Sequence, residues 1–214
     1  MFLKFKSLFG LILSKPRSYN PKAYWIEQGE TYKQKYHERF EKRLQENGYD
    51  RNIGVLMSTL HEFDFKSILD VGCGYGLYLQ VIEQEFPDLD DIQGCDISLT
   101  QLEEAREFLG PDSRVKLSET DGIHLPYPDK HFDIVITYGV CIHVADNKIE
   151  DFLLEILRVA RQAYIFIESS SFINEHSYFA HNYPDIFAKM GAPLEIRKEL
   201  DPKHKERLYV ADLR

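Results

Sequence analysis

The chain has 214 residues, of which 43% are apolar, enough for one well-buried domain and too few for two full ones. Its 35 acidic and 26 basic side chains give a formal net charge of -9, which disfavours a protein built to coat a nucleic-acid backbone. The three cysteines, Cys73, Cys95 and Cys141, show no paired spacing, which indicates a reduced, cytoplasmic protein rather than a disulfide-bonded or zinc-binding one.

The first segment, MFLKFKSLFGLILSK (residues 1–15), carries apolar side chains at helical spacing with lysines elsewhere. Two interpretations stay open: an amphipathic helix that lies weakly on a membrane surface or a partner, and a segment that packs on its own domain or frays. Its apolar run is short, contains Gly10 and lacks a small-residue cleavage site, which disfavours a signal peptide. We therefore expect a cytoplasmic protein, with peripheral membrane contact as the open alternative.

Two helices are predicted before the main domain. Pro16 and Pro21 interrupt the chain, and residues 23–48 then show a mostly helical pattern that ends at Gly48. A second helix is predicted from Asp50, which can cap it, to Glu62. Residues 1–49 are thus expected to form a helical appendage or lid, and residues 50–214 the main domain.

Short apolar strings alternate with helical patterns in the rest of the chain. Strands are predicted at residues 67–71, 91–95, 114–118, 132–138 and 163–168, and helices at residues 76–86, 99–109 and 148–161. This alternation predicts an α/β fold in which parallel strands are covered on both faces. A helix at residues 183–190 then ends at Gly191, and residues 194–200 and 206–213 predict a closing hairpin with one antiparallel strand.

Three glycines, Gly72, Gly74 and Gly76, directly follow the first strand in LDVGCGYG. In an open parallel sheet, ligands bind beyond the carboxyl ends of the strands. Gly72 and Gly74 lack a Cβ, so they can adopt unusual dihedrals and let a ligand approach the main chain near a helix start. The third glycine of the dinucleotide fingerprint would fall at position 77, where Leu77 stands, so a nicotinamide dehydrogenase is disfavoured.

Acidic residues end the next two strands. Asp96 follows Gly76 by 20 residues and can accept two hydrogen bonds from ribose hydroxyls. Asp121, with Gly122 and Ile123 behind it, can accept from an exocyclic amine while the apolar neighbour lies against the ring. Either acid alone is equally explained as a solvated turn residue. At successive strand ends beside a glycine loop, the pair indicates a nucleoside-containing ligand.

These motifs together resemble the class I S-adenosylmethionine-dependent methyltransferases over about residues 50–168. LDVGCGYG is similar to their first motif, GCDIS to their ribose-binding acid, TDGIHLPYPDKHFDIV to their adenine loop and fourth strand, and LLEILRVARQAYIFIE to their fifth helix and strand. The resemblance implies a Rossmann-like three-layer sandwich with a seven-stranded, mostly parallel sheet, and S-adenosylmethionine as cofactor. The cofactor-binding positions that it implies are Asp70, Gly72, Cys73, Gly74, Gly76, Asp96, Ile97, Asp121, Gly122, Ile123 and Tyr138.

The fourth strand ends in TYGVCIHVADN, which places Tyr138 and His143 near the expected methyl-transfer point as candidate catalytic residues. His143 can take a proton from an acceptor hydroxyl, because its unperturbed pKa lies near neutrality. A structural histidine that bonds a backbone carbonyl is the alternative.

Two further groups of side chains are candidates near the site. Glu168, His176, His181 and Tyr183 fall where the family usually builds its acceptor pocket, with ordinary loop polarity as the alternative. The aromatic residues Tyr24, Trp25, Tyr32 and Tyr36 lie on one predicted helix face. They are either core packing or a lid that covers the sulfonium and excludes water.

The absence of two motifs narrows the acceptor. The fourth strand ends in TYGV, without the Asn/Asp-Pro-Pro-aromatic sequence of enzymes that methylate nucleic-acid amines and glutamine amides. Asp146 and Asn147 follow the fourth strand, whereas magnesium-dependent catechol enzymes need such a pair after the fifth, so no catalytic metal is expected. We expect methylation of a small molecule or sugar at oxygen, with no nucleic-acid partner. A protein or RNA acceptor, and an inactive cofactor-binding regulatory module, remain alternatives.

Overall fold

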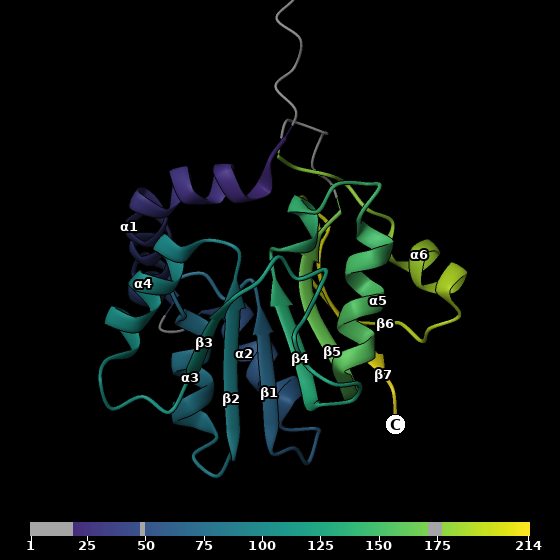
Figure 1. The fold of residues 1–214 in the computed structure, drawn as a ribbon, viewed down its shortest axis with the longest axis horizontal. Coiled ribbons are helices and arrows are strands. Elements are labelled where there is room, and N and C mark those ends of the chain that lie inside the picture. The colour runs from purple at the N-terminus through teal and green to yellow at the C-terminus, as the bar shows by residue number, and fades with distance from the viewer. Residues whose placement is uncertain (1–18, 48–49, 171–176) are drawn as a thin grey trace, which may run out of the picture.

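The computed structural model describes residues 19–47, 50–170 and 177–214, which form a seven-stranded sheet with helices on both faces (Figure 1). Residues 1–15, with the predicted amphipathic segment, and His176 lie outside the described residues. The strands are β1 (Ser67–Val71), β2 (Asp91–Asp96), β3 (Lys116–Glu119), β4 (Phe132–Tyr138), β5 (Ala160–Ser169), β6 (Glu195–Asp201) and β7 (Glu206–Asp212). The helices are α1 (Pro21–Asn47), α2 (Arg51–Leu60), α3 (Leu77–Glu85), α4 (Leu99–Leu109), α5 (Ile149–Val159) and α6 (Tyr183–Met190), with a 3-10 turn, η1, at Cys141–His143.

The strand order is β3-β2-β1-β4-β5-β7-β6. The pairs from β3 to β5 are all parallel, whereas β7 pairs antiparallel with both β5 and β6. The order reverses between β1 and β4, because the chain first builds β2 and β3 on one side of β1 and then continues on the other. The predicted parallel sheet with a closing antiparallel hairpin is confirmed.

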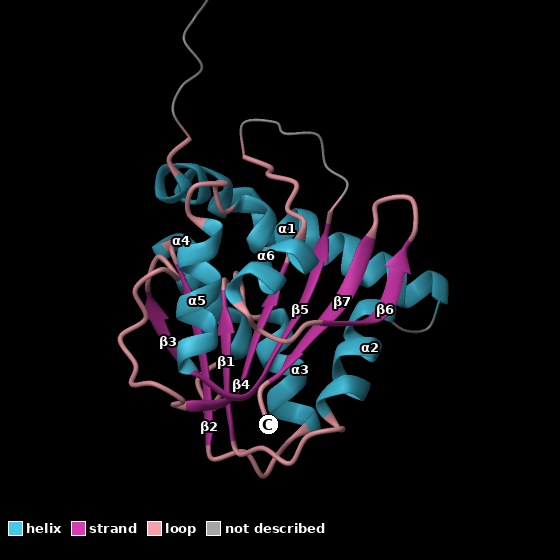
Figure 2. Ribbon diagram, turned by 90° about the vertical axis from the view of Figure 1, so that its right-hand side faces the viewer, coloured by secondary structure: helices cyan, strands magenta, loops and turns pink. Residues whose placement is uncertain are grey.

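Each face of the sheet buries its own apolar core, because successive strand side chains point to opposite faces. On β1, Ile68 joins the core beneath α2, α3 and α4, while its neighbour Leu69 joins the core beneath α5 and α6. Both side chains are fully buried. The result is the predicted three-layer sandwich, and Figure 2 shows the helices on the two sides of the sheet.

Several element boundaries differ from the sequence prediction by one to three residues, and contacts explain two of these differences. The helix predicted to reach Arg161 ends at Val159, and β5 begins at once with Ala160, which pairs with Phe132 of β4. The third strand begins at Lys116 instead of Arg114, because the Arg114 amide donates to Glu83 of α3 at 2.6 Å and so is not available to the sheet. Long-range contacts, absent from the local pattern, decide both boundaries.

Helix α1 lies across the end of the sheet at which the parallel strands terminate (Figure 1). Two ion pairs hold it there: Lys22 contacts Glu119 at 2.6 Å, and Lys33 contacts Glu104 of α4 at 2.6 Å. None of the helices in the described part of the chain is long and apolar enough to cross a membrane.

Candidate functional site

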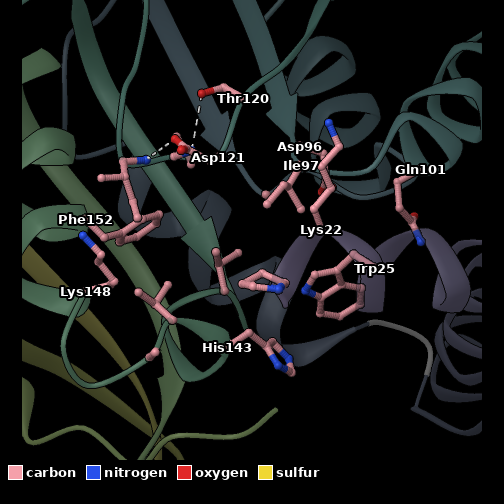
Figure 3. A pocket seen from close by; sticks show the side chains of 18 of the residues that line it. Lys22, Trp25, Asp96, Ile97, Gln101, Thr120, Asp121, His143, Lys148 and Phe152 are labelled. Carbon is pink, nitrogen blue, oxygen red and sulfur yellow. Dashed lines mark hydrogen bonds between the residues drawn. The ribbon is translucent and has the colours of Figure 1, made fainter. Parts of the chain in front are cut away.

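A cavity of about 860 Å³ lies at the carboxyl ends of β1 to β4 and is bounded on one side by residues of α1 (Figure 3). Pockets for small ligands usually measure about 300 to 1,000 Å³, so this one can hold a cofactor and a small acceptor together. The predicted site residues that line it are Gly72, Gly74, Asp96, Ile97, Asp121, Gly122, Ile123, Tyr138 and His143. The strand order reverses beside it, where open parallel sheets bind ligands.

The loop after β1 brings bare backbone to the cavity wall. Gly72 and Gly74 have φ of 78° and 54°, in the left-handed region that favours glycine. A Cβ on Gly72 would lie 2.5 Å from Cγ2 of Val140, so a side chain has no room there. The Gly72 amide donates to the Cys95 carbonyl at 2.7 Å, and the Gly74 amide to Oδ2 of Asp96 at 3.0 Å. The loop is therefore tied to the end of β2.

Asp96 stands at the centre of the site. Its Oδ1 accepts the Ser98 amide at 2.9 Å while Oδ2 accepts from Gly74, and each carboxylate oxygen can accept a further hydrogen bond. Burial raises the pKa of Asp96 to about 6, although the amide hydrogen bonds oppose this rise. The remaining lone pairs suit ligand hydroxyls.

Three predicted cofactor positions lie behind the wall of the cavity and do not line it: Asp70, Cys73 and Gly76. Burial, and after it the nearby charge of Asp96, raises the pKa of Asp70 to about 8. Gly76 is the N-cap of α3 with a φ of 86°. Asp70 therefore acts from behind the loop, through its charge on Asp96, and not by contact with the cavity.

Asp121 organises the far end of the cavity. Its Oδ1 accepts the Ile123 and His124 amides at 2.9 and 3.0 Å. Burial alone would raise the pKa of Asp121, but these bonds outweigh it and lower the pKa. The apolar side chains of Ile97, Ile123 and Phe152 also line the cavity, so a flat ring can lie among them with a carboxylate at its edge.

The loop after β4 is held in place by buried polar groups behind it. Glu168 accepts the Val140 and Cys141 amides, both at 2.7 Å, and Nε2 of His181 donates to the Cys141 and Val144 carbonyls at 3.0 and 2.9 Å. The sequence suggested Glu168, His181 and Tyr183 as acceptor-pocket residues. In the structure all three are buried and none lines the cavity.

His143 is carried on this loop and lines the cavity. Its Nδ1 lies 2.6 Å from the Ser177 carbonyl, which can only accept, so Nδ1 holds the proton and Nε2 keeps a lone pair. Burial lowers the pKa of His143 to about 4, against the opposing effect of the Ser177 bond, so the ring is neutral near neutral pH. The bond to a backbone carbonyl is thus observed for Nδ1, while a catalytic role for Nε2 stays a prediction.

Tyr138 lines the cavity with its ring, which lies 4.8 Å from the ring of Tyr78. Its hydroxyl accepts a hydrogen bond from the Asn52 amide of α2 at 3.0 Å. The hydroxyl is thereby fixed to a neighbouring helix, so the ring shapes the cavity wall.

The aromatic residues of α1 form one side of the cavity. Trp25 and Tyr32 line it, with ring centroids 5.4 Å apart, and Tyr36 stacks on Tyr32 at 4.1 Å. The Trp25 ring meets that of His143 edge-on at 4.8 Å and 90° (Figure 3). Ser98 Oγ donates to the Trp25 carbonyl at 3.1 Å, which ties α1 to the start of α4.

Sequence reasoning missed Gln101, whose side chain is 1% exposed and lines the cavity. A signal was present: Gln101 and Ala105 are four residues apart on α4, and both lie on its buried face. A polar residue on the apolar face of a helix that follows a strand end indicates a candidate ligand-binding residue.

Comparison with known proteins shows what the middle of the chain resembles. Residues 68–163 match the family described as "Methyltransferase domain". Residues 68–163 are thus similar to a methyltransferase domain. Ajmaline N-methyltransferase of Rauvolfia serpentina is 34% identical over 100 residues, which cover 44% of this chain and 32% of that protein. Phosphoethanolamine N-methyltransferase 2 of Caenorhabditis elegans is 33% identical over 106 residues, covering 47% and 23%. The chain thus spans about a third or less of the length of these relatives.

A solved structure supports the fold. Magnesium protoporphyrin IX methyltransferase of Synechocystis PCC 6803, whose structure has bound SAH, is 16% identical and superposes with a TM-score of 0.68, over 89% of this chain and 97% of that one. The residues present fit S-adenosylmethionine, the cofactor that the resemblance implies. The site offers the Asp96 carboxylate, which would accept from ribose hydroxyls, and side-chain-free backbone at Gly72 and Gly74.

Proposed function

We propose that this protein transfers a methyl group from S-adenosylmethionine to a small-molecule acceptor, at a hydroxyl oxygen. The observation that carries the proposal is the loop after β1, in which the Gly74 amide donates to the Asp96 carboxylate at the wall of the cavity. The same cavity reaches His143, so cofactor and acceptor can share it. Methyl transfer requires that shared, in-line arrangement.

When bound, S-adenosylmethionine supplies an electrophilic methyl group. The chain's own groups would align the acceptor and keep water away from it. Trp25 and Tyr32 cover one side of the cavity with apolar rings, and η1 closes another through its buried contacts with Glu168 and His181. An exclusion of water of this kind suits a reaction in which hydrolysis would compete.

His143 would hold the acceptor. Because its Nδ1 is committed to the Ser177 carbonyl, Nε2 can accept a hydrogen bond from an acceptor hydroxyl. During methyl transfer the hydroxyl proton would pass to Nε2 of His143. A pKa of about 4 makes this nitrogen a weak base, so proton transfer accompanies methyl transfer and does not precede it.

An amine acceptor is the second candidate. It is favoured by the names of two relatives, ajmaline N-methyltransferase and phosphoethanolamine N-methyltransferase 2, both of which point to nitrogen of small molecules. A free amine is a stronger nucleophile than a hydroxyl and needs no positioned base, so the two candidates differ in their dependence on His143.

The test has two stages. Calorimetric titration of the full chain with S-adenosylmethionine, and with NAD for comparison, measures cofactor choice. Release of S-adenosylhomocysteine is then followed with pools of hydroxylated metabolites, sugars and amines. Cofactor binding with turnover on a small molecule is the expected result, and binding without turnover on any pool, including proteins and RNA, would replace the proposal by a binding module.

The His143→Gln variant separates oxygen from nitrogen. With a hydroxyl acceptor we expect turnover to fall about 100-fold while cofactor affinity is kept, since a positioned base contributes roughly that factor. With an amine acceptor turnover is expected to change little. His131→Gln, at an exposed residue outside the cavity, is the matched control and is expected to behave as the wild type in both assays.

A further inference from the structure

The buried side-chain amide of Gln101 makes no hydrogen bond to the described part of the protein. It lies in the first turn of α4, where its backbone amide is capped by Ser98 Oγ at 3.4 Å. The side chain is 1% exposed, and among the described residues neither Oε1 nor Nε2 has a hydrogen-bond partner. A buried primary amide without partners destabilises the fold, whereas an apolar side chain of the same shape would not. The amide therefore points to a ligand.

The position of the amide narrows the ligand. Gln101 lines the cavity five residues after Asp96, from the helix that follows β2 (Figure 3). A Cβ built on Gly74 would lie 3.7 Å from Oε1 of Gln101 and 3.5 Å from the ring of Tyr32. The Gly74 amide donates to Asp96 at 3.0 Å. The amide of Gln101 and the carboxylate of Asp96 thus flank the same glycine.

The two side chains are chemically complementary toward a pair of neighbouring hydroxyls. The Asp96 carboxylate can only accept, and each of its oxygens already holds one backbone amide, so it can take up hydroxyl protons but cannot donate to hydroxyl oxygens. A primary amide has two donors and an acceptor. A diol held by a carboxylate alone would leave its own oxygens without donors in a buried site.

We propose that Gln101 binds the ribose of the cofactor, donating from Nε2 to a ribose hydroxyl oxygen whose neighbouring hydroxyl is held by Asp96. This inference rests on the proposed cofactor site and names a residue that determines its specificity for a ribose. Tyr32, on α1, covers the same corner of the cavity, so the amide–hydroxyl bond is shielded from water.

The test compares wild type with Gln101→Met, which keeps the length of the side chain and removes the amide. In calorimetry with S-adenosylhomocysteine we expect affinity to fall about tenfold, the usual size for one buried hydrogen bond. With methylthioadenosine, which lacks the amino-acid tail, the tenfold ratio between the two proteins is expected to persist. Of the 2′-deoxy and 3′-deoxy analogues of S-adenosylhomocysteine, the one that lacks the hydroxyl bound by Gln101 is expected to bind both proteins about equally, so that the affinity ratio shrinks to about one.

A second readout needs no ligand. Because an unsatisfied amide is removed, the ligand-free Gln101→Met protein is expected to unfold at a higher temperature than the wild type. Gln101→Glu keeps the size and loses the donors, so its affinity is expected to fall at least as far as that of Gln101→Met.

Each result bears on the inference separately from the proposed function. If the wild type binds no S-adenosylhomocysteine, the cofactor site is wrong and the inference falls with it. If the wild type binds and Gln101→Met binds equally well, the inference alone is wrong. A ratio that disappears with methylthioadenosine would move Gln101 to the amino-acid end of the cofactor and overturn the ribose assignment.

Discussion

Glu168→Gln is expected to remove a pH dependence of stability from the protein. Glu168 is 1% exposed, its Oε1 accepts two backbone amides of the loop after β4, and its Oε2 has no partner in the described part of the chain. Burial raises the pKa of this carboxyl from its ordinary value of 4.5 to about 8, although the amide hydrogen bonds oppose the rise. Near neutral pH the folded protein therefore holds Glu168 in its neutral form, which glutamine imitates.

The sign and size of the effect follow from linkage. A carboxyl whose pKa is higher in the folded than in the unfolded state favours folding fully below 4.5, and this contribution is lost as the pH rises through about 8. At about 1.4 kcal/mol per pKa unit, the wild type should lose about 4 kcal/mol of unfolding free energy relative to Glu168→Gln between roughly pH 5 and roughly pH 9. Asp70 and Asp96 titrate in both proteins, so their contributions cancel in the difference.

Urea unfolding followed by far-ultraviolet circular dichroism, at a series of pH values, measures this difference. The absolute stability of the variant can differ from that of the wild type by a constant, because the amide nitrogen replaces an oxygen in a buried place. Only the change of the difference with pH carries the argument. Two parallel stability curves would show that Glu168 is ionised at neutral pH, and the reasoning from its burial would be refuted.

Three further predictions concern single positions. In Gly72→Ala the alanine must adopt a φ of 78° and place its Cβ 2.5 Å from Val140, so urea unfolding should show a loss of about 3 kcal/mol of unfolding free energy. The control Gly191→Ala, where φ is 67° and nothing lies within 4 Å of the added Cβ, should lose about 1 kcal/mol. Equal losses in the two variants would contradict the steric argument. Burial raises the pKa of Asp133, but bonds from the Lys66 amide, Arg161 and Gln162 outweigh it and lower the pKa to about 2. The ionised Asp133 therefore stabilises the fold fully above pH 3.8, and this stabilisation is lost as the pH falls to about 2. Unfolding measured at a series of acidic pH values should show Asp133→Asn about 2 kcal/mol less stable than the wild type near neutral pH and equally stable near pH 2. A stability difference that does not change with pH would contradict this reasoning. Gly29→Val places a Cβ 2.8 Å from that of Thr100, so it should displace α1 from α4 and lower the affinity for S-adenosylhomocysteine about tenfold in calorimetry. The control Gly54→Val on α2, where nothing lies within 4 Å of the added Cβ, should keep the wild-type affinity. Equal affinities in the two variants would mean that α1 does not cover the cofactor.

Local patterns predicted those elements whose ends are marked in the sequence itself. The ranges of β1, β4, α4 and α6 agree with the prediction to the residue, since turn or capping residues bound them; Ser98 caps α4, and Gly191 ends α6 with a φ of 67°. The junction of α5 and β5 was misplaced because no glycine or proline separates helix from strand there. Pairing of Ala160 with β4, a contact 28 residues away in sequence, fixes the boundary.

In the candidate site too, features set by local sequence could be predicted, and features set by distant contacts could not. The glycine loop and Asp96 were recognisable because the geometry that they need is local to two strand ends. The groups that hold His143 in place could not be recognised from the sequence, because they come from segments more than twenty residues away. Ser177 bonds His143 directly, and Glu168 and His181 hold the loop that carries it. Similarly, the sequence showed an aromatic face on α1, but only the fold reveals that the face lies against His143 and the start of α4.

Trp25 is the one tryptophan in the sequence, and it stands at the wall of the cavity, edge-on to His143. The intrinsic fluorescence of the protein, excited where tyrosine no longer absorbs, therefore originates entirely beside the site. An adenine ring or an acceptor that enters, or a movement of α1, alters the polarity and the quenching groups around that single indole. The protein thus carries a built-in optical reporter, with which ligand arrival can be timed by stopped flow without attaching a dye.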